Sequence, residues 1–110
     1  MHELAVTQSI LDIVLKHAGT RMVKQISLVI GQFSSIVDDS VQLYWNIIAK
    51  DTLAEGALLH FTRIPGEMTC NTCGHLFQPD SVTFTCPVCA SLSVHVSKGR
   101  EFYVQSIDVE

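Results

Sequence analysis

The stretches Cys70-Asn71-Thr72-Cys73 and Cys86-Pro87-Val88-Cys89 hold all four cysteines of this 110-residue chain, as two C-x-x-C pairs separated by residues 74–85. Each pair can place two thiolates on one side of an ion, and a hairpin between the pairs can complete a tetrahedron. This spacing predicts a zinc site with Cys70, Cys73, Cys86 and Cys89 as its ligands. Because four cysteines leave no open position for a substrate, the zinc is expected to be structural.

Other uses of paired cysteines suit this sequence less well. A rubredoxin-type iron centre takes the same geometry, and a red colour of the purified protein would identify it. A thioredoxin-like redox pair needs one C-x-x-C at the start of a helix after a strand, and Pro87 does not suit that position. A disulfide framework would spread its cysteines along the chain and follow a signal peptide, and no basic secretory segment is seen near Met1.

Outside the cysteine region, the spacing of apolar residues predicts two helices and three strands. The helices are expected over residues 3–18 and 38–50, and the strands over residues 23–30, 57–64 and 101–109. Gly19 is expected to end the first helix, and Asp38 or Asp39 to cap the second. The last strand is expected to return to the sheet formed by the other two.

The expected fold is therefore α+β, a small mixed β-sheet with two helices and an inserted zinc ribbon held by the four cysteines. Residues 1–65 and 100–110 would form one α/β domain, and residues 66–99 would form the ribbon. About 34 residues are too few to bury an adequate apolar core, so the ribbon is expected to depend on its metal.

Composition narrows the class of protein. Hydrophobic residues make up 47% of the chain and charged residues 16%, which indicates a globular protein and not a disordered one. The net charge is −4 and no basic stripe is present, so a nucleic-acid partner is not expected. No apolar run is long enough to span a bilayer, and a cytoplasmic location is expected. No nucleophile, base and orienting group recur at a recognisable spacing, so the chain is not expected to be an enzyme.

The first three residues, Met1-His2-Glu3, offer a second kind of metal chemistry. If the Met1 amine is free, it can close one chelate ring with the His2 backbone nitrogen, and the His2 Nδ1 can close another. Glu3 can supply a fourth donor through its backbone nitrogen or its carboxylate. A planar set of nitrogen and oxygen donors suits Ni(II) or Cu(II). From the pattern alone, an ordinary helix start is the simpler interpretation, because Glu near a helix N-terminus is favoured by the helix dipole.

The whole chain resembles the HypA/HybF family of hydrogenase nickel-incorporation proteins. The resemblance includes Met1-His2-Glu3 before an amphipathic helix and the paired cysteine motifs with Cys86-Pro87-Val88-Cys89. It continues through the segments Val29-Ile30-Gly31-Gln32-Phe33-Ser34, Glu55-Gly56-Ala57-Leu58-Leu59, Gly99-Arg100-Glu101 and Ile107-Asp108-Val109-Glu110. Ala90 departs from the family pattern, because glycine is frequent after the last cysteine.

The resemblance implies a nickel metallochaperone that works in the maturation of [NiFe]-hydrogenase. By position, it makes His2 the main Ni(II) ligand together with the Met1 amine, and Glu3 a ligand or a support. It implies two partners, a HypB-type GTPase and the large subunit of [NiFe]-hydrogenase. The expected oligomeric state is a monomer or a weak homodimer, and the particular nickel enzyme served stays open.

Two alternatives remain open at this point. The chain could be a zinc-ribbon module that binds a protein or a nucleic acid, with an incidental N-terminus. His75 and His95 flank the cysteine motifs, and either could hydrogen-bond a thiolate or replace a cysteine on the zinc. His17 is interpreted as structural, and His60 as a surface or packing residue.

Overall fold

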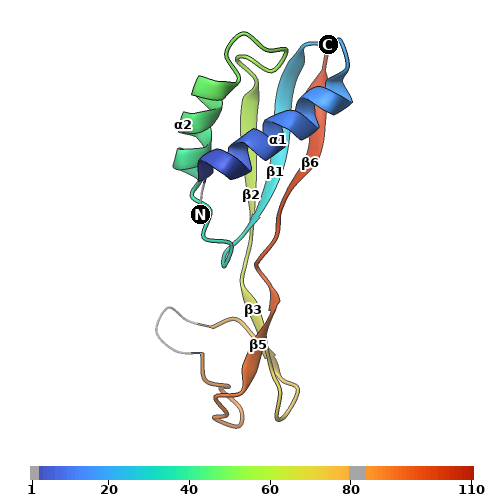
Figure 1. The fold of residues 1–110 in the computed structure, drawn as a ribbon. Coiled ribbons are helices and arrows are strands. Elements are labelled where there is room, and N and C mark those ends of the chain that lie inside the picture. The colour runs from blue at the N-terminus through green and yellow to red at the C-terminus, as the bar shows by residue number, and fades with distance from the viewer. Residues whose placement is uncertain (1–2, 80–83) are drawn as a thin grey trace. The chain divides into compact units, whose positions relative to one another are not determined.

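A computed structural model describes residues 3–79 and 84–110 and shows two helices and two small sheets (Figure 1). The elements in chain order are α1 Glu3–Ala18, β1 Val23–Gly31, α2 Asp38–Ile48, β2 Leu58–Ile64, β3 Glu67–Cys70, β4 Leu76–Phe77, β5 Val94–Lys98 and β6 Phe102–Val109. The predicted α+β class is confirmed, and each predicted helix and strand is present within two residues of its expected ends. Neither described helix is long and apolar enough to cross a membrane.

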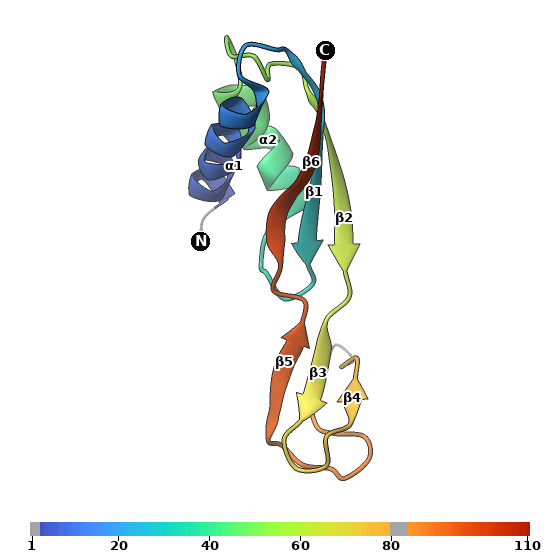
Figure 2. The same cartoon turned by 90° about the vertical axis from the view of Figure 1, so that its right-hand side faces the viewer.

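The first sheet has the strand order β2-β1-β6, so the last strand of the chain does return to it, as predicted. Both helices lie on the same face of this sheet (Figure 2). The core is apolar at the places where the helices meet the sheet. It includes Ile10 and Val14 of α1, Ile26 and Leu28 of β1, and Val41 and Trp45 of α2, all of them buried.

The helix ends follow local chemistry. Gly19 takes a left-handed conformation with φ of 67°, and its amide donates to the Leu15 carbonyl, so it ends α1 as predicted. The predicted cap of α2 is wrong by one residue. The N-cap is Val37, which makes no side-chain capping bond, and Asp38 and Asp39 lie in the first turn, where the helix dipole favours their negative charges.

The second sheet is an antiparallel ribbon with the strand order β4-β3-β5. Met68 lies opposite Phe77 of β4 and Val96 of β5, and Cys70 lies opposite Val94. By compactness the chain divides into one unit of residues 1–29, 35–62 and 102–110 and another of residues 30–34 and 63–101. The second unit contains the whole ribbon.

Phe33 packs against two glycines within the second unit. A Cβ atom on Gly66 or Gly99 would overlap the Phe33 ring. Backbone bonds hold the segment in place: the Phe33 amide donates to the Gly99 carbonyl at 2.6 Å, and the Gln32 amide donates to the Ile64 carbonyl at 2.9 Å. The strands that lead into and out of the ribbon are thus tied together by residues 31–34.

Candidate metal centre

The two C-x-x-C motifs form two turns with the same hydrogen bonds. In the first, the Gly74 amide donates to the Cys70 carbonyl at 2.9 Å, and the Cys70 amide donates to the His75 carbonyl at 2.9 Å. In the second, Ala90 donates to the Cys86 carbonyl at 2.9 Å and Cys86 donates to the Ser91 carbonyl at 3.0 Å. The chain therefore builds the same knuckle twice, each with its first cysteine buried and its second exposed.

The four sulfur atoms come together. All four Sγ atoms lie within 4.8 Å of one another. Cys70 Sγ is 3.5 Å from Cys89 Sγ, and Cys73 Sγ is 3.7 Å from Cys86 Sγ. A tetrahedral zinc ion with Zn–S bonds of about 2.3 Å requires sulfur atoms about 3.8 Å apart. The donor set and its spacing therefore fit a metal of zinc's size and geometry.

Backbone amides support the buried sulfurs. The amides of Thr72 and Cys73 donate to Cys70 Sγ at 3.3 and 3.4 Å, and the amide of Val88 donates to Cys86 Sγ at 3.4 Å. Such bonds favour the thiolate, which is the form that binds metal.

The pKa values of the thiols diverge because of these contacts. The Cys73 amide lowers the pKa of Cys70 to about 6, against the opposing effect of burial. Burial acts to raise the pKa of Cys86, but the amides of Cys89 and Val88 outweigh it, so that pKa is lowered. The Ser91 amide acts to lower the pKa of Cys89, yet the neighbouring Cys70 sulfur and burial raise it to about 12. In each knuckle, the buried first cysteine therefore has a lowered pKa.

Polar side chains join the two knuckles, and sequence reasoning missed them. Thr72 Oγ1 lies 2.9 Å from Ser91 Oγ. The Asn71 amide donates to the Ser93 carbonyl at 2.9 Å, and Asn71 Nδ2 donates to Ser93 Oγ at 3.2 Å. The sequence does contain a signal for these contacts. Asn71 and Thr72 lie between the first two cysteines, and Ser91 and Ser93 follow the last cysteine.

The histidines take other partners. The His75 ring stacks on Phe77, and His95 Nδ1 lies 2.5 Å from Asn71 Oδ1. His60 Nε2 lies 2.6 Å from Gln25 Oε1, and His17 is exposed near the end of α1. Among residues 3–79 and 84–110, the four cysteines form a cluster of potential metal ligands, and no histidine belongs to this cluster.

Of the three predicted nickel ligands, the structure describes Glu3 alone. Met1 and His2 are outside the described residues, and Glu3 is the first residue of the helix. The Thr7 hydroxyl, which is fully buried, donates to the Glu3 carbonyl and holds the first turn. The backbone that carries Glu3 is therefore fixed to the core of the first unit.

Known proteins match this chain over essentially its full length. The family profile described as HypA, hydrogenase/urease nickel incorporation, metallochaperone, matches residues 1–109. A hydrogenase maturation factor HypA of Caldanaerobacter subterraneus is 41% identical, and one of Dehalococcoides mccartyi is 40% identical. Each alignment covers 100% of this chain, together with 100% of the first relative and 95% of the second.

Solved structures show the same fold. The solution structure of the Ni metallochaperone HypA from Helicobacter pylori matches 99% of this chain and 97% of its own with a TM-score of 0.67 and 23% identity. A second solution structure of a HypA protein matches 100% of this chain and 97% of its own with a TM-score of 0.73 and 23% identity. The paired-cysteine ribbon, the α+β fold and the full-length similarity lead to one conclusion: this chain belongs to the HypA family of hydrogenase and urease nickel-incorporation metallochaperones.

Proposed function

We propose that this chain binds Ni(II) through Met1, His2 and Glu3 and delivers it during the maturation of [NiFe]-hydrogenase. The observation that carries the proposal is the extent of the family match, which begins at residue 1 and so includes these three residues. Three nitrogen donors in one plane suit Ni(II), and a shallow site at a chain terminus suits metal that must be released again. The chain acts as a carrier and not as an enzyme, and its partners are a HypB-type GTPase and the hydrogenase large subunit.

The test is a Ni(II) titration of protein with a free Met1 amine. His2→Ala is expected to weaken Ni(II) binding at least about a hundredfold, since even partners of metal ligands contribute roughly 10–100-fold. His17→Ala is the matched control, because it removes an exposed histidine from the same helix, and it should bind like the wild type. Equal affinity in the His2→Ala variant and the wild type would refute the proposal, as would full affinity in a protein extended by a few residues before Met1.

We further propose that Cys70, Cys73, Cys86 and Cys89 hold one structural Zn(II). The support is the 3.5 and 3.7 Å sulfur separations together with amide bonds to the buried sulfurs. Bound zinc would link the two knuckles and complete the ribbon. Metal analysis of the purified protein is expected to find one zinc per chain, whereas a red protein containing iron would refute this assignment.

A second candidate function is protein binding by the ribbon alone, without metal delivery. Leu92 is 82% exposed and Val88 is 66% exposed, and apolar side chains in such positions favour a protein partner over a nucleic acid. Normal hydrogenase maturation by the His2→Ala variant would favour this function. Salt-dependent binding of DNA or RNA by the purified protein would instead favour a nucleic-acid module.

A further inference from the structure

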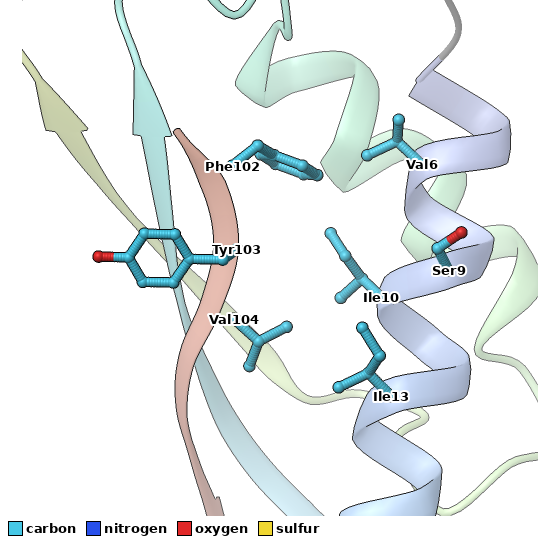
Figure 3. Close-up of a pocket in the computed structure, with 7 residues that line it drawn as sticks. All are labelled: Val6, Ser9, Ile10, Ile13, Phe102, Tyr103 and Val104. Atoms are coloured by element: carbon cyan, nitrogen blue, oxygen red, sulfur yellow. The ribbon is translucent and has the colours of Figure 1, made fainter. Parts of the chain in front are cut away.

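The exposed apolar side chains on the two helices lie in different settings. Ile13 of α1 is 45% exposed and lines a hollow of about 390 Å³ between α1 and β6. Phe102 and Val104 of β6 point toward α1 in this hollow, so Ile13 has apolar neighbours within the chain (Figure 3). On α2, Leu43 is 59% exposed and Ile47 is 62% exposed. These two residues are called the apolar pair below.

The apolar pair lies on the face of α2 that points away from the core. Val41 and Trp45 are the buried residues of this helix. Since each residue advances about 100° around a helix, Leu43 lies about 160° from both of them. Ile47 follows Leu43 by four residues and so lies on the same face, about one turn further along. Packing within the first unit therefore gives no reason for apolar side chains at these two positions.

One charge of each sign bounds the apolar pair. Asp39 is exposed in the first turn of α2, and Lys50 is exposed just beyond its last turn. The C-cap Ala49 keeps a right-handed helical conformation, so Lys50 continues the course of the helix. The two charged residues and the apolar pair lie within about 80° of one another around the axis. The order along this face is therefore acid, apolar, apolar, base.

This order is complementary to itself in an antiparallel pair of helices. Consider a two-fold axis that crosses the exposed face level with Tyr44 and Trp45. Asp39 and Lys50 then lie about 8 Å from that axis on opposite sides, so Asp39 of each copy comes opposite Lys50 of the other. The apolar pairs of the two copies meet within about 4 Å of the axis, measured along the helices. Two-fold pairing of identical surfaces is also the commonest form of protein assembly.

The charges by themselves have a simpler explanation, because the helix dipole favours an acid in the first turn and a base after the last one. That explanation does not extend to Leu43 and Ile47, which the dipole leaves unexplained. A second copy accounts for both observations, since it covers the apolar pair and places opposite charges at both ends. Two apolar side chains per copy are few for a permanent interface, so the association is expected to be weak and reversible.

We propose that the exposed face of α2 binds a second copy of this chain, with the two α2 helices antiparallel about a two-fold axis. Leu43 and Ile47 form the centre of the interface, and Asp39 and Lys50 determine its orientation. None of the proposed metal ligands takes part. The pairing therefore stands or falls independently of nickel delivery.

Sedimentation equilibrium of the purified full-length protein, from micromolar to millimolar concentration, tests the pairing. Leu43→Asp is expected to weaken self-association at least about tenfold, because it places two charges at the centre of the interface. Ile13→Asp is the matched control. It introduces the same charge at an exposed apolar position of α1 and should associate like the wild type. Helical circular dichroism of both variants monitors their folding.

Charge exchange tests which residues face each other. Asp39→Lys alone, or Lys50→Asp alone, brings like charges together at both ends of the interface and should weaken self-association. A mixture of these two variants should associate again, because each lysine of one then faces an aspartate of the other. Recovery in the mixture also shows that both variants are folded.

A chain that carries both exchanges tests the antiparallel direction. The Asp39→Lys, Lys50→Asp double variant should self-associate like the wild type. It should not pair with the wild type, because lysine would then face lysine and aspartate would face aspartate. In a parallel arrangement the double variant would instead prefer the wild type as its partner. Different fluorescent labels on the two proteins distinguish these results.

Several results would overturn the proposal. A wild type that stays monomeric at millimolar concentration, equal association of Leu43→Asp and the wild type, or a mixture that associates no better than its single variants would each refute it. Preferential pairing of the double variant with the wild type would refute the antiparallel arrangement. If the wild type were monomeric and Leu43→Asp lost binding to the HypB-type GTPase, the face would belong to that partner and the proposal would be wrong.

Discussion

At the scale of single residues, the two knuckles differ at the position after their second cysteine. Gly74 and Ala90 both take left-handed conformations, with φ of 78° and 61°. Glycine adopts this conformation without steric cost, but the Cβ of alanine comes close to the following carbonyl oxygen. The family resemblance already marked Ala90 as a departure, and the structure gives that departure a physical consequence.

Replacing Ala90 with glycine should therefore stabilise the metal-loaded ribbon. The expected gain is about 1 kcal/mol in the free energy of unfolding, because relief of left-handed strain exceeds the added chain entropy. Gly74→Ala is the reciprocal variant and should lose a similar amount, since nothing lies within 4 Å of its new Cβ and backbone strain is the main cost. Denaturant unfolding of the two zinc-loaded variants measures both values. A destabilised Ala90→Gly protein would contradict this account.

At the scale of elements, periodicity is sufficient to predict local structure but not distant packing. The spacing of Ile10 and Val14 and the alternation of Ile26 and Leu28 predict α1 and β1, because burial of one face fixes both patterns. The cysteine spacing predicts the metal cluster because each C-x-x-C turn places two thiolates on one side of an ion. Phe33, Gly66 and Gly99 lie far apart in sequence, so no local pattern could show that the ring packs against both glycines.

The contact between Phe33 and Gly66 predicts a specific coupling. Gly66→Ala should cost about 1–3 kcal/mol in the free energy of unfolding, because its Cβ would overlap the Phe33 ring. In a Phe33→Ala background the same change should cost less than about 0.5 kcal/mol, since the obstructing ring is absent. A double-mutant cycle measured by denaturant unfolding gives the difference. Equal costs in the two backgrounds would show that the glycine is required for another reason.

At the scale of the whole molecule, the two compact units are stabilised by different means. The first buries apolar side chains from α1, α2 and β1, including Val14, Val41 and Trp45. In the described ribbon strands and knuckles, the buried side chains are Met68, Cys70 and Cys86, two of which are proposed metal ligands. So small an apolar core requires an added link between the knuckles. The first unit has no such requirement, and its proposed nickel ligands lie outside the cysteine cluster.

Removal of the metal should therefore unfold residues 66–99 and leave residues 1–65 and 100–110 folded. Chelation, or the Cys86→Ser variant, is expected to keep the helical circular dichroism, because α1 and α2 both belong to the first unit. Trypsin should then cleave rapidly after Lys98 of β5, while sites in α1 stay protected. Adding zinc back should restore resistance in the chelated wild type but not in Cys86→Ser. If the helical signal and Ni(II) binding fell in proportion to zinc loss, the nickel-binding domain would depend on the ribbon, and the two would have to be treated as one folding unit.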